Sequence, residues 1–176
     1  MPEFAKQLYK DRPLETALRF EDKTMSWSDI DITLNKVANG LHEMDLGSQR
    51  RIAVFSENAL ETAMANLGGL IAGASVVPVN FHLTYEEVAY ILEDSGASVL
   101  FVGPETIERG LKAAGLSGVK KVIGWNIEEE EAQQFIHWSK WLDSSQDKEP
   151  PMDLEPLPNL LYTSGTTGRP KGTDLP

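Results

Sequence analysis

The chain has 176 residues and 41% hydrophobic content, which is enough for one domain with a substantial buried core. It contains no cysteine, and this excludes disulfides and thiolate metal sites. Its 27 acidic residues outnumber the 16 basic ones, and the net charge of −11 argues against nucleic acid or an anionic membrane surface as a partner.

The N-terminal residues predict a short β-hairpin followed by a helix. No apolar stretch follows a basic start, so we expect no signal peptide and a cytoplasmic protein. Residues 16–20 and 24–27 have the composition of two strands, joined by a tight turn at 21–23. Ser28 is the expected N-cap of the helix, with Asp31 three residues later.

The helix after Ser28 should turn one apolar stripe toward the core. Its apolar residues recur at helical spacing: Ile30, Leu34, Val37, Leu41 and Met44. Gly47 is the expected terminator, because glycine adopts the left-handed conformation that commonly ends helices.

Residues 52–79 predict a strand, a helix and a second strand. The apolar run 52–55 suits a buried strand, a helix over 58–72 runs to Gly73, and 76–79 forms the next strand. A helix of this length between two strands indicates a right-handed parallel crossover.

Part of this region, residues 63–79, also resembles a membrane segment. It is apolar, but Asn66 and Pro78 interrupt it and it falls short of a spanning helix. Its G-x-x-x-G pattern from Gly69 to Gly73 could pair helices in a bilayer. We favour a buried helix whose glycines permit close packing, and we expect no transmembrane segment.

The strand–helix alternation then continues. Thr84 and Glu87 form a capping box before a helix that Gly96 closes. Further elements are expected at 99–102 (strand), 105–114 (helix) and 119–124 (strand). The chain is therefore expected to be an α/β protein with a mostly parallel sheet and helices on both faces.

The region before the last strand carries three weaker signals. The run Glu128–Glu131 is more consistent with a solvated helix start than with a metal or catalytic site. Ile136, Trp138, Trp141 and Leu142 indicate a core-facing helix. Three scattered histidines show no ligand spacing, and residues 143–158, with four prolines and five acids, indicate a surface linker.

The most informative segment is Tyr162–Gly172, called the signature segment below. Eleven residues hold three glycines, four small hydroxyl side chains and two cations, directly after an apolar strand at 159–163. Glycines let backbone N–H groups approach an anion, hydroxyls add donors, and Lys171 supplies a compact positive charge. Such a composition suits a loop around a polyphosphate at the carboxyl end of a parallel strand.

Two other interpretations of this segment fit its residues less well. A Walker A loop is excluded, because Pro170 occupies its second glycine position and Gly172 follows Lys171 in place of Ser or Thr. A flexible surface turn would explain Ser164–Gly168 alone. It does not explain why Tyr162 precedes these residues and Arg169–Gly172 follow them.

The signature segment resembles that of the adenylate-forming enzymes, which include acyl-CoA synthetases, luciferases and nonribosomal-peptide adenylation domains. The family pattern, Tyr-Thr-Ser-Gly-Thr-Thr-Gly-x-Pro-Lys-Gly, matches Tyr162 through Gly172. Residues that resemble N-terminal blocks of the same family lie at 15–27, 50–58, 69–80 and 83–102. The resemblance implies the N-terminal part of such an enzyme's large domain, with 14–142 as α/β core, 143–158 as linker and 159–172 as strand and phosphate-binding loop.

The resemblance also implies a reaction and its ligands. The family uses ATP with Mg²⁺ to form an acyl-adenylate and pyrophosphate, and a thiol of coenzyme A or a carrier protein then takes the acyl group. The implied phosphate-binding residues are Thr163, Ser164, Gly165, Thr166, Thr167, Gly168 and Lys171. The blocks at 15–27 and 83–102 look most like those of fatty acyl-CoA synthetases.

Several parts of such an enzyme have no counterpart in this chain. The adenine and ribose contacts, the acyl pocket and the catalytic lysine lie further along in the family, so no catalytic residue is assigned and the remainder of the chain is an expected partner. Relatives usually continue with an apolar residue after the signature, whereas Thr173 follows here. A fatty acyl-AMP ligase that loads an acyl carrier protein is the alternative enzyme, and a non-catalytic nucleotide- or partner-binding module is the alternative of another class.

Overall fold

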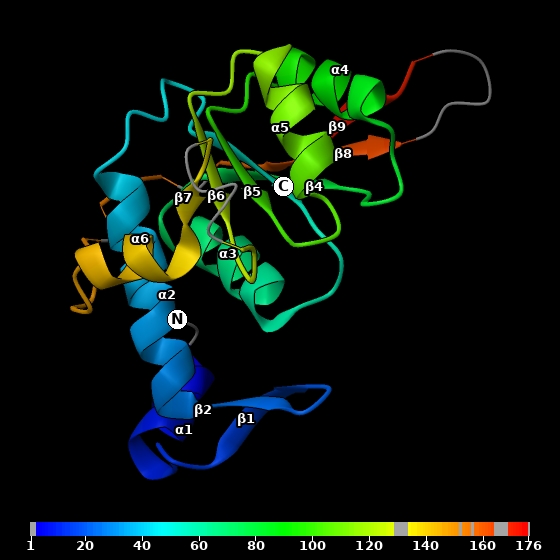
Figure 1. Cartoon of the computed structure of the whole chain (residues 1–176). Coiled ribbons are helices and arrows are strands. Elements are labelled where there is room, and N and C mark those ends of the chain that lie inside the picture. Colours follow the sequence, from blue (N-terminus) through cyan, green and yellow to red (C-terminus); the bar gives the residue numbers. More distant parts are fainter. Residues whose placement is uncertain (1–2, 129–133, 152, 156, 164–168, 176) are drawn as a thin grey trace.

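Helices and strands alternate along most of the chain in this computed structural model, which describes residues 3–128, 134–151, 153–155, 157–163 and 169–175 (Figure 1). The helices are α1 (Glu3–Asp11), α2 (Trp27–His42), α3 (Leu60–Ile71), α4 (Tyr85–Ser95), α5 (Ile107–Gly115) and α6 (Trp138–Ser144). The strands are β1 (Thr16–Phe20), β2 (Lys23–Ser26), β3 (Arg51–Phe55), β4 (Ser75–Val79), β5 (Val99–Val102), β6 (Lys121–Gly124), β7 (Ile136–His137), β8 (Asn159–Thr163) and β9 (Lys171–Leu175).

Five strands form one parallel sheet in the order β4-β3-β5-β6-β7. In its register Ile52 of β3 lies between Val76 of β4 and Val99 of β5. The central strands are continuous apolar runs, as expected where both faces of a sheet are covered. The predicted α/β class with a mostly parallel sheet is confirmed.

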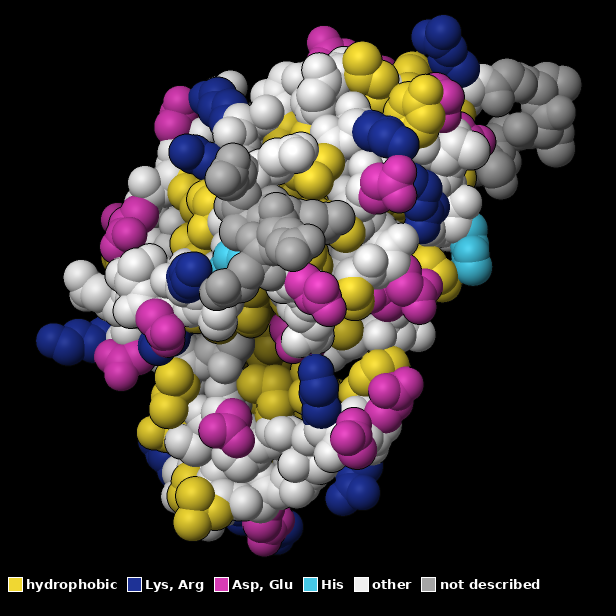
Figure 2. Space-filling view, viewed as in Figure 1, with side chains coloured by type: hydrophobic (Ala, Val, Ile, Leu, Met, Phe, Trp, Pro, Cys, Tyr) yellow, Lys and Arg dark blue, Asp and Glu magenta, His cyan; other side chains and the backbone are white. Residues whose placement is uncertain are grey.

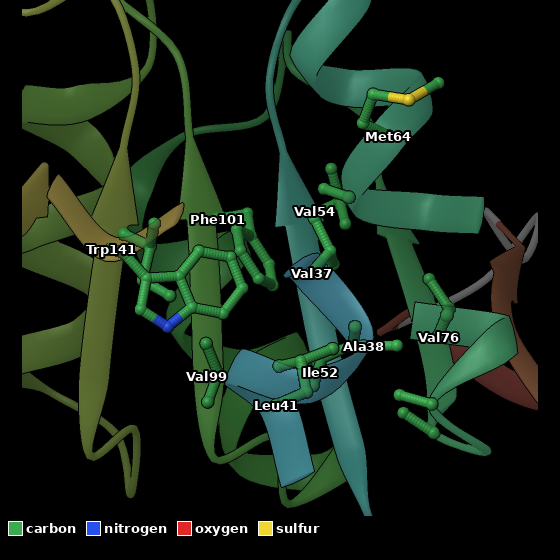
Figure 3. Packing of buried hydrophobic residues seen from close by; sticks show 14 of the residues in the cluster. Val37, Ala38, Leu41, Ile52, Val54, Met64, Val76, Val99, Phe101 and Trp141 are labelled. Atoms are coloured by element: carbon green, nitrogen blue, oxygen red, sulfur yellow. The ribbon is translucent and has the colours of Figure 1, made fainter. Parts of the chain in front are cut away.

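Helices cover both faces of the sheet, so alternate strand residues enter two separate cores. Ile52 and Val54 pack with α2, α3 and α6, whereas Ala53 and Phe55 pack with α4 and α5. Figure 3 shows the first core, where Val37 and Leu41 of α2 lie over β3 and Trp141 of α6 lies near β5.

The glycine-rich stretch 63–79 is a buried helix end followed by a strand, as predicted. α3 has 12 residues, and β4 begins at Ser75 after a left-handed Gly73 with φ of 71°. Among the described residues no helix combines the length and the apolar character that a membrane crossing needs.

The caps of α4 are those predicted, and those of α2 are not. Thr84 accepts from the backbone N–H of Glu87, whose carboxylate accepts from Thr84 N at 2.9 Å, and Gly96 ends α4 with φ of 66°. In α2 the N-cap is Ser26, which forms the same reciprocal pair with Asp29.

The prediction of Ser28 as N-cap was wrong by two residues, because each serine has an aspartate three positions later. Ser28 lies inside the first turn, and its N–H donates to Pro13 O at 2.9 Å. Gly47 does not end the helix either. α2 stops at His42, and the left-handed Gly47 lies in the following loop.

The region before β8 differs in part from the prediction. Ile136 belongs to the short strand β7 and pairs with Ile123, whereas the helix begins only at Trp138. Trp138 and Trp141 are buried against the core, as predicted. Glu128 is exposed, and the rest of the predicted helix start at Glu128–Glu131 lies outside the described residues.

Candidate functional site

The described part of the signature segment forms the ends of a hairpin. β8 and β9 pair in antiparallel fashion, and Thr163 opposite Lys171 is the pair nearest the connecting loop. Residues directly opposite each other in an antiparallel pair share one face. The Thr163 and Lys171 side chains therefore leave adjacent strand positions on the same face, and both are exposed.

Of the seven predicted phosphate-binding residues, only Thr163 and Lys171 lie in the described part of the chain. Ser164, Gly165, Thr166, Thr167 and Gly168 lie outside it. The structure thus places the two residues that flank the loop and brings them together. A hydroxyl donor beside a cation can bind a phosphate oxygen.

The hairpin lies beside the parallel sheet without joining it, which differs from the prediction. Val76 N donates to the side-chain Oδ1 of Asn159 at 3.1 Å, and Ser75 Oγ donates to Pro158 O at 2.6 Å. Pro78 has no N–H to offer. The exposed edge of β4 therefore meets β8 through side chains, and β8 forms its backbone ladder with β9.

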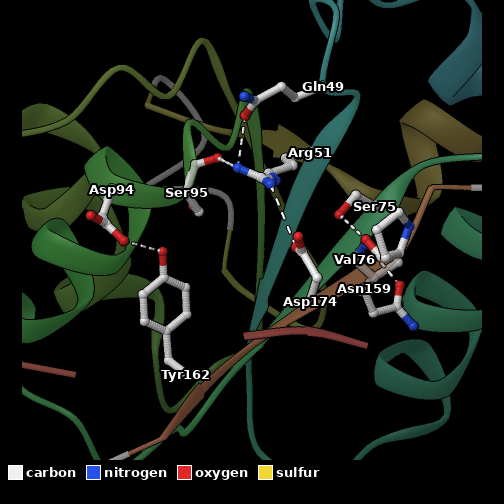
Figure 4. Close-up of polar contacts among 10 residues, drawn as sticks. Gln49, Arg51, Ser75, Val76, Asp94, Ser95, Asn159, Tyr162 and Asp174 are labelled. Carbon is white, nitrogen blue, oxygen red and sulfur yellow. Dashed lines mark hydrogen bonds and ion pairs between the residues drawn. The ribbon is translucent and has the colours of Figure 1, made fainter. Parts of the chain in front are cut away.

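The open end of the hairpin contacts the beginnings of two sheet strands. Pro158, Asn159 and Asp174 meet Ser75, Val76 and Arg51, which begin β4 and β3 (Figure 4). The predicted position of the loop at the carboxyl ends of the parallel strands stays a prediction, because Ser164–Gly168 lie outside the described residues.

Tyr162 connects β8 to α4. Its phenol O–H donates to Asp94 Oδ2 at 2.6 Å, and a Cβ built on the opposite residue, Gly172, would lie 3.2 Å from the Tyr162 ring atom Cζ (Figure 4). Burial, followed by the hydrogen bond to Asp94, raises the pKa of the Tyr162 phenol well above its ordinary value. Tyr162 therefore remains a neutral donor at physiological pH.

A cation–π contact and an ion pair add to this attachment. The Arg169 guanidinium lies over the ring of Tyr90 in α4, with its carbon 5.2 Å from the ring centroid. At the other end of the hairpin, Arg51 faces Asp174 at 3.9 Å and also donates to Ser95 O at 2.8 Å. Sequence reasoning missed Tyr90 and Asp94, because both are ordinary polar positions of an amphipathic helix.

A separate cavity of about 390 Å³ opens at the carboxyl ends of β3, β5 and β6. It lies between the β1–β2 hairpin and the sheet, where the surface in Figure 2 is hollowed and lined with hydrophobic side chains. Its charged lining is mainly acidic and includes Glu57, Glu61 and Glu105. This charge disfavours phosphate, so the hairpin remains the candidate phosphate site. No group of three or more His, Asp or Glu within the described ranges could hold a metal ion.

Comparison with known proteins identifies the family. The family described as AMP-binding enzyme matches residues 4–175. The chain belongs to this family. The match spans the whole α/β body and both strands of the hairpin, so the AMP-binding assignment does not depend on the signature segment alone.

Individual AMP-binding relatives differ in what their names say they make. The chain is 33% identical to feruloyl-CoA synthase of an Amycolatopsis species over 93% of its length, and 30% identical to surfactin synthase subunit 1 of Bacillus subtilis over 94%. A solved structure of a Mycobacterium tuberculosis fatty acyl CoA synthetase matches 97% of the chain with a TM-score of 0.75 and 25% identity.

The chain spans only part of each of these proteins. It covers 30% of the feruloyl-CoA synthase, 4% of the surfactin synthase subunit and 33% of the fatty acyl CoA synthetase chain. These shares agree with the expectation that the sequence corresponds to a portion of an adenylate-forming enzyme.

Proposed function

We propose that this chain is the N-terminal portion of an ATP-dependent ligase that activates a fatty acid as its acyl-adenylate and transfers the acyl group to coenzyme A. The observation that carries the proposal is the signature segment. A glycine- and hydroxyl-rich loop is closed by the exposed pair Thr163 and Lys171, within a chain that matches the AMP-binding family over residues 4–175.

The chemistry gives each part of this segment a role. When a carboxylate attacks the α-phosphorus of ATP, pyrophosphate leaves and negative charge builds on the β- and γ-phosphates. Donors aimed at those oxygens lower the barrier. Lys171 supplies a charge and Thr163 a hydroxyl, and we assign the loop residues Ser164–Gly168 the further donors. Mg²⁺ would arrive with the phosphates, since it needs few protein ligands there.

A fatty acid is the proposed substrate for two reasons. The blocks 15–27 and 83–102 look like those of fatty acyl-CoA synthetases, and a fatty acyl CoA synthetase is among the similar structures. Coenzyme A is the proposed acceptor because the similar proteins include two enzymes that are named for an acyl-CoA product, a feruloyl-CoA synthase and a fatty acyl CoA synthetase. The similarity to surfactin synthase supports a carrier protein as the second candidate acceptor.

The decisive experiment uses the complete ligase that contains this chain. Exchange of labelled pyrophosphate into ATP would be measured with fatty acids of several chain lengths, an aromatic acid and amino acids. Exchange that depends on a fatty acid supports the proposal, and exchange only with another class of acid overturns the substrate assignment. Adding coenzyme A or a phosphopantetheinylated carrier protein then identifies the acceptor by the thioester that forms.

The same assay tests the chain by itself. We expect no exchange with any carboxylic acid, because the resemblance assigns the acyl pocket and the catalytic lysine to positions beyond this chain. Measurable exchange by residues 1–176 alone would show that these residues are sufficient for adenylation.

A further inference from the structure

We propose that α4 positions the phosphate-binding loop, with Asp94 and Tyr90 as positioning residues that hold the two ends of the loop through Tyr162 and Arg169. This inference rests on the proposed function, because it assigns a role in the same reaction to a helix outside the signature segment. It concerns how the loop is held and names no further contact to the substrate.

The first contact fixes the strand that enters the loop. Tyr162 lies one residue before Thr163, and its phenol donates to the Asp94 carboxylate at 2.6 Å. A hydrogen bond to a charged acceptor is shorter and stronger than one between neutral groups. The Tyr162 ring also covers Gly172 on the opposite strand, where a Cβ would lie within 3.3 Å of the phenol oxygen. One side chain thus joins both strands of the hairpin to α4.

The second contact fixes the chain as it leaves the loop. Arg169 lies two residues before Lys171, and its guanidinium lies over the Tyr90 ring at 5.2 Å. Tyr90 and Asp94 are four residues apart in α4, so both side chains lie on one face of the helix. A single rigid face therefore meets the chain on both sides of Ser164–Gly168.

The position of α4 is itself well determined. Its N-terminus has the complete Thr84–Glu87 capping box, and its buried side is part of the second core through Val88, Ile91 and Leu92. Arg51 of β3 reaches the Ser95 carbonyl at the end of α4 and faces Asp174 of β9. Because α4 is fixed against the sheet, its contacts hold the hairpin in a defined orientation relative to the sheet.

The contacts of α4 with Tyr162 and Arg169 are of the kind that a phosphate-binding loop needs. Donors that stabilise a leaving phosphate must be held close to their productive positions before reaction. Glycine allows more backbone conformations than any other residue, so a glycine-rich sequence is a weak determinant of donor positions. Contacts immediately before Thr163 and before Lys171 supply that restriction from outside the loop.

The test is a double-mutant cycle in the complete ligase with ATP–pyrophosphate exchange as the readout. Asp94→Asn replaces the charged acceptor with a neutral one and should lower kcat/KM for ATP by a few-fold, while KM for the acid stays constant. Tyr162→Phe removes the donor and should lower kcat/KM for ATP by roughly three- to ten-fold. The double variant should lose no more than Tyr162→Phe alone. If the losses in kcat/KM of the two single variants multiply in the double variant, the two residues act independently and the role of Asp94 is refuted. Unchanged kcat/KM in both single variants would refute it as well.

The Tyr90 contact has its own conservative control. Tyr90→Leu removes the aromatic face under Arg169 and should lower kcat/KM for ATP by a few-fold, whereas Tyr90→Phe keeps the ring and should restore most of it. Equal losses in both variants would contradict a cation–π role. Asp143→Asn, which makes the same chemical change as Asp94→Asn at an exposed position of α6, should leave all constants unchanged.

A second measurement does not depend on ATP. Trypsin cleaves poorly before proline, so the Lys171–Gly172 bond reports on the hairpin better than the Arg169–Pro170 bond does. In the complete protein, Asp94→Asn should speed cleavage after Lys171 several-fold, and Asp143→Asn should not. If the wild type lacks ATP–pyrophosphate exchange, the proposed function fails. The cleavage rates still decide whether α4 holds the hairpin, and equal rates in both variants would refute it.

Discussion

The backbone of Gly68 in α3 lies directly against Val37 of α2. A Cβ atom built on Gly68 would stand only 2.4 Å from Val37 Cγ1, and one built on the neighbouring Gly69 would stand 2.5 Å from Ile52 Cδ1 in β3. One glycine therefore lets α3 approach α2, and the next lets it approach the sheet. Both contacts lie in the core shown in Figure 3.

Gly68→Ala should destabilise the protein by about 1–3 kcal/mol, because the added methyl group has no room beside a fully buried Val37. Urea unfolding measures this loss. The matched control is Gly115→Ala at the end of α5, where an added Cβ would meet nothing within 4 Å, and its stability should be unchanged or slightly higher. Equal stabilities in both variants would show that the close contact is not a constraint.

The glycines illustrate what the sequence could predict about the fold. Their density within an apolar segment interrupted by Asn66 and Pro78 indicated a closely packed buried helix, and α3 is one. Capping boxes, apolar runs and Gly96 located α4 and most strands for the same local reasons. The sheet order β4-β3-β5-β6-β7 has no such local signal, because it depends on pairing between strands that are separated in the chain by whole helices.

Ser26→Ala should cost about 0.5–2 kcal/mol, because it removes the acceptor for Asp29 N at the start of α2. Ser28→Ala should change stability by less than about 0.5 kcal/mol, since Ser28 lies inside the first turn and makes no capping bond. Thermal unfolding of the two variants compares the two possible caps directly. A larger loss for Ser28→Ala would contradict the cap that the structure shows.

The same pair of serines shows why this boundary could not be predicted. Ser26 and Ser28 each precede an aspartate by three residues, so the local pattern is ambiguous. The choice follows from tertiary contacts, since Trp27 N donates to Glu15 O and Ser28 N donates to Pro13 O. These hydrogen bonds to residues 13 and 15 therefore decide which serine begins the helix.

The sequence predicted which residue types make up the candidate site, but only part of how they are arranged in space. The residue types of the signature segment identified the family, and the match over residues 4–175 confirms it. The antiparallel hairpin was not expected, because the pairing of β8 with β9 depends on Thr173–Leu175, which carry no strong strand signal. The bond between Tyr162 and Asp94 joins residues 68 positions apart, and a single sequence gives no indication of it.

Lys171→Ala in the complete ligase should lower kcat/KM for ATP by roughly ten- to hundred-fold, because it removes a charge-assisted phosphate contact of about 1.5–3 kcal/mol. Lys140→Ala in α6 is the matched control, since Lys140 is also exposed but lies outside the hairpin. ATP–pyrophosphate exchange measures both variants. A Lys171 variant as active as the Lys140 variant would refute the role assigned to the ammonium group.

Asp31→Asn should stabilise the protein near neutral pH. Burial, followed by the nearby Glu149 carboxylate, raises the pKa of Asp31 above its ordinary value of 3.8, so the ionised side chain opposes folding. The folded state holds the proton more tightly than the unfolded state does. The cost of ionised Asp31 is therefore fully present above the folded-state pKa and is relieved as the pH falls toward 3.8.

Urea unfolding of wild type and Asp31→Asn over a range of acidic to neutral pH measures this dependence. The advantage of the variant should be largest near neutrality and should shrink as the pH falls through the folded-state pKa. Asp143→Asn, at an exposed position, should show no comparable gain. An advantage for Asp31→Asn that grows on acidification would mean that ionised Asp31 stabilises the fold, since protonation would then remove a favourable interaction from the wild type alone.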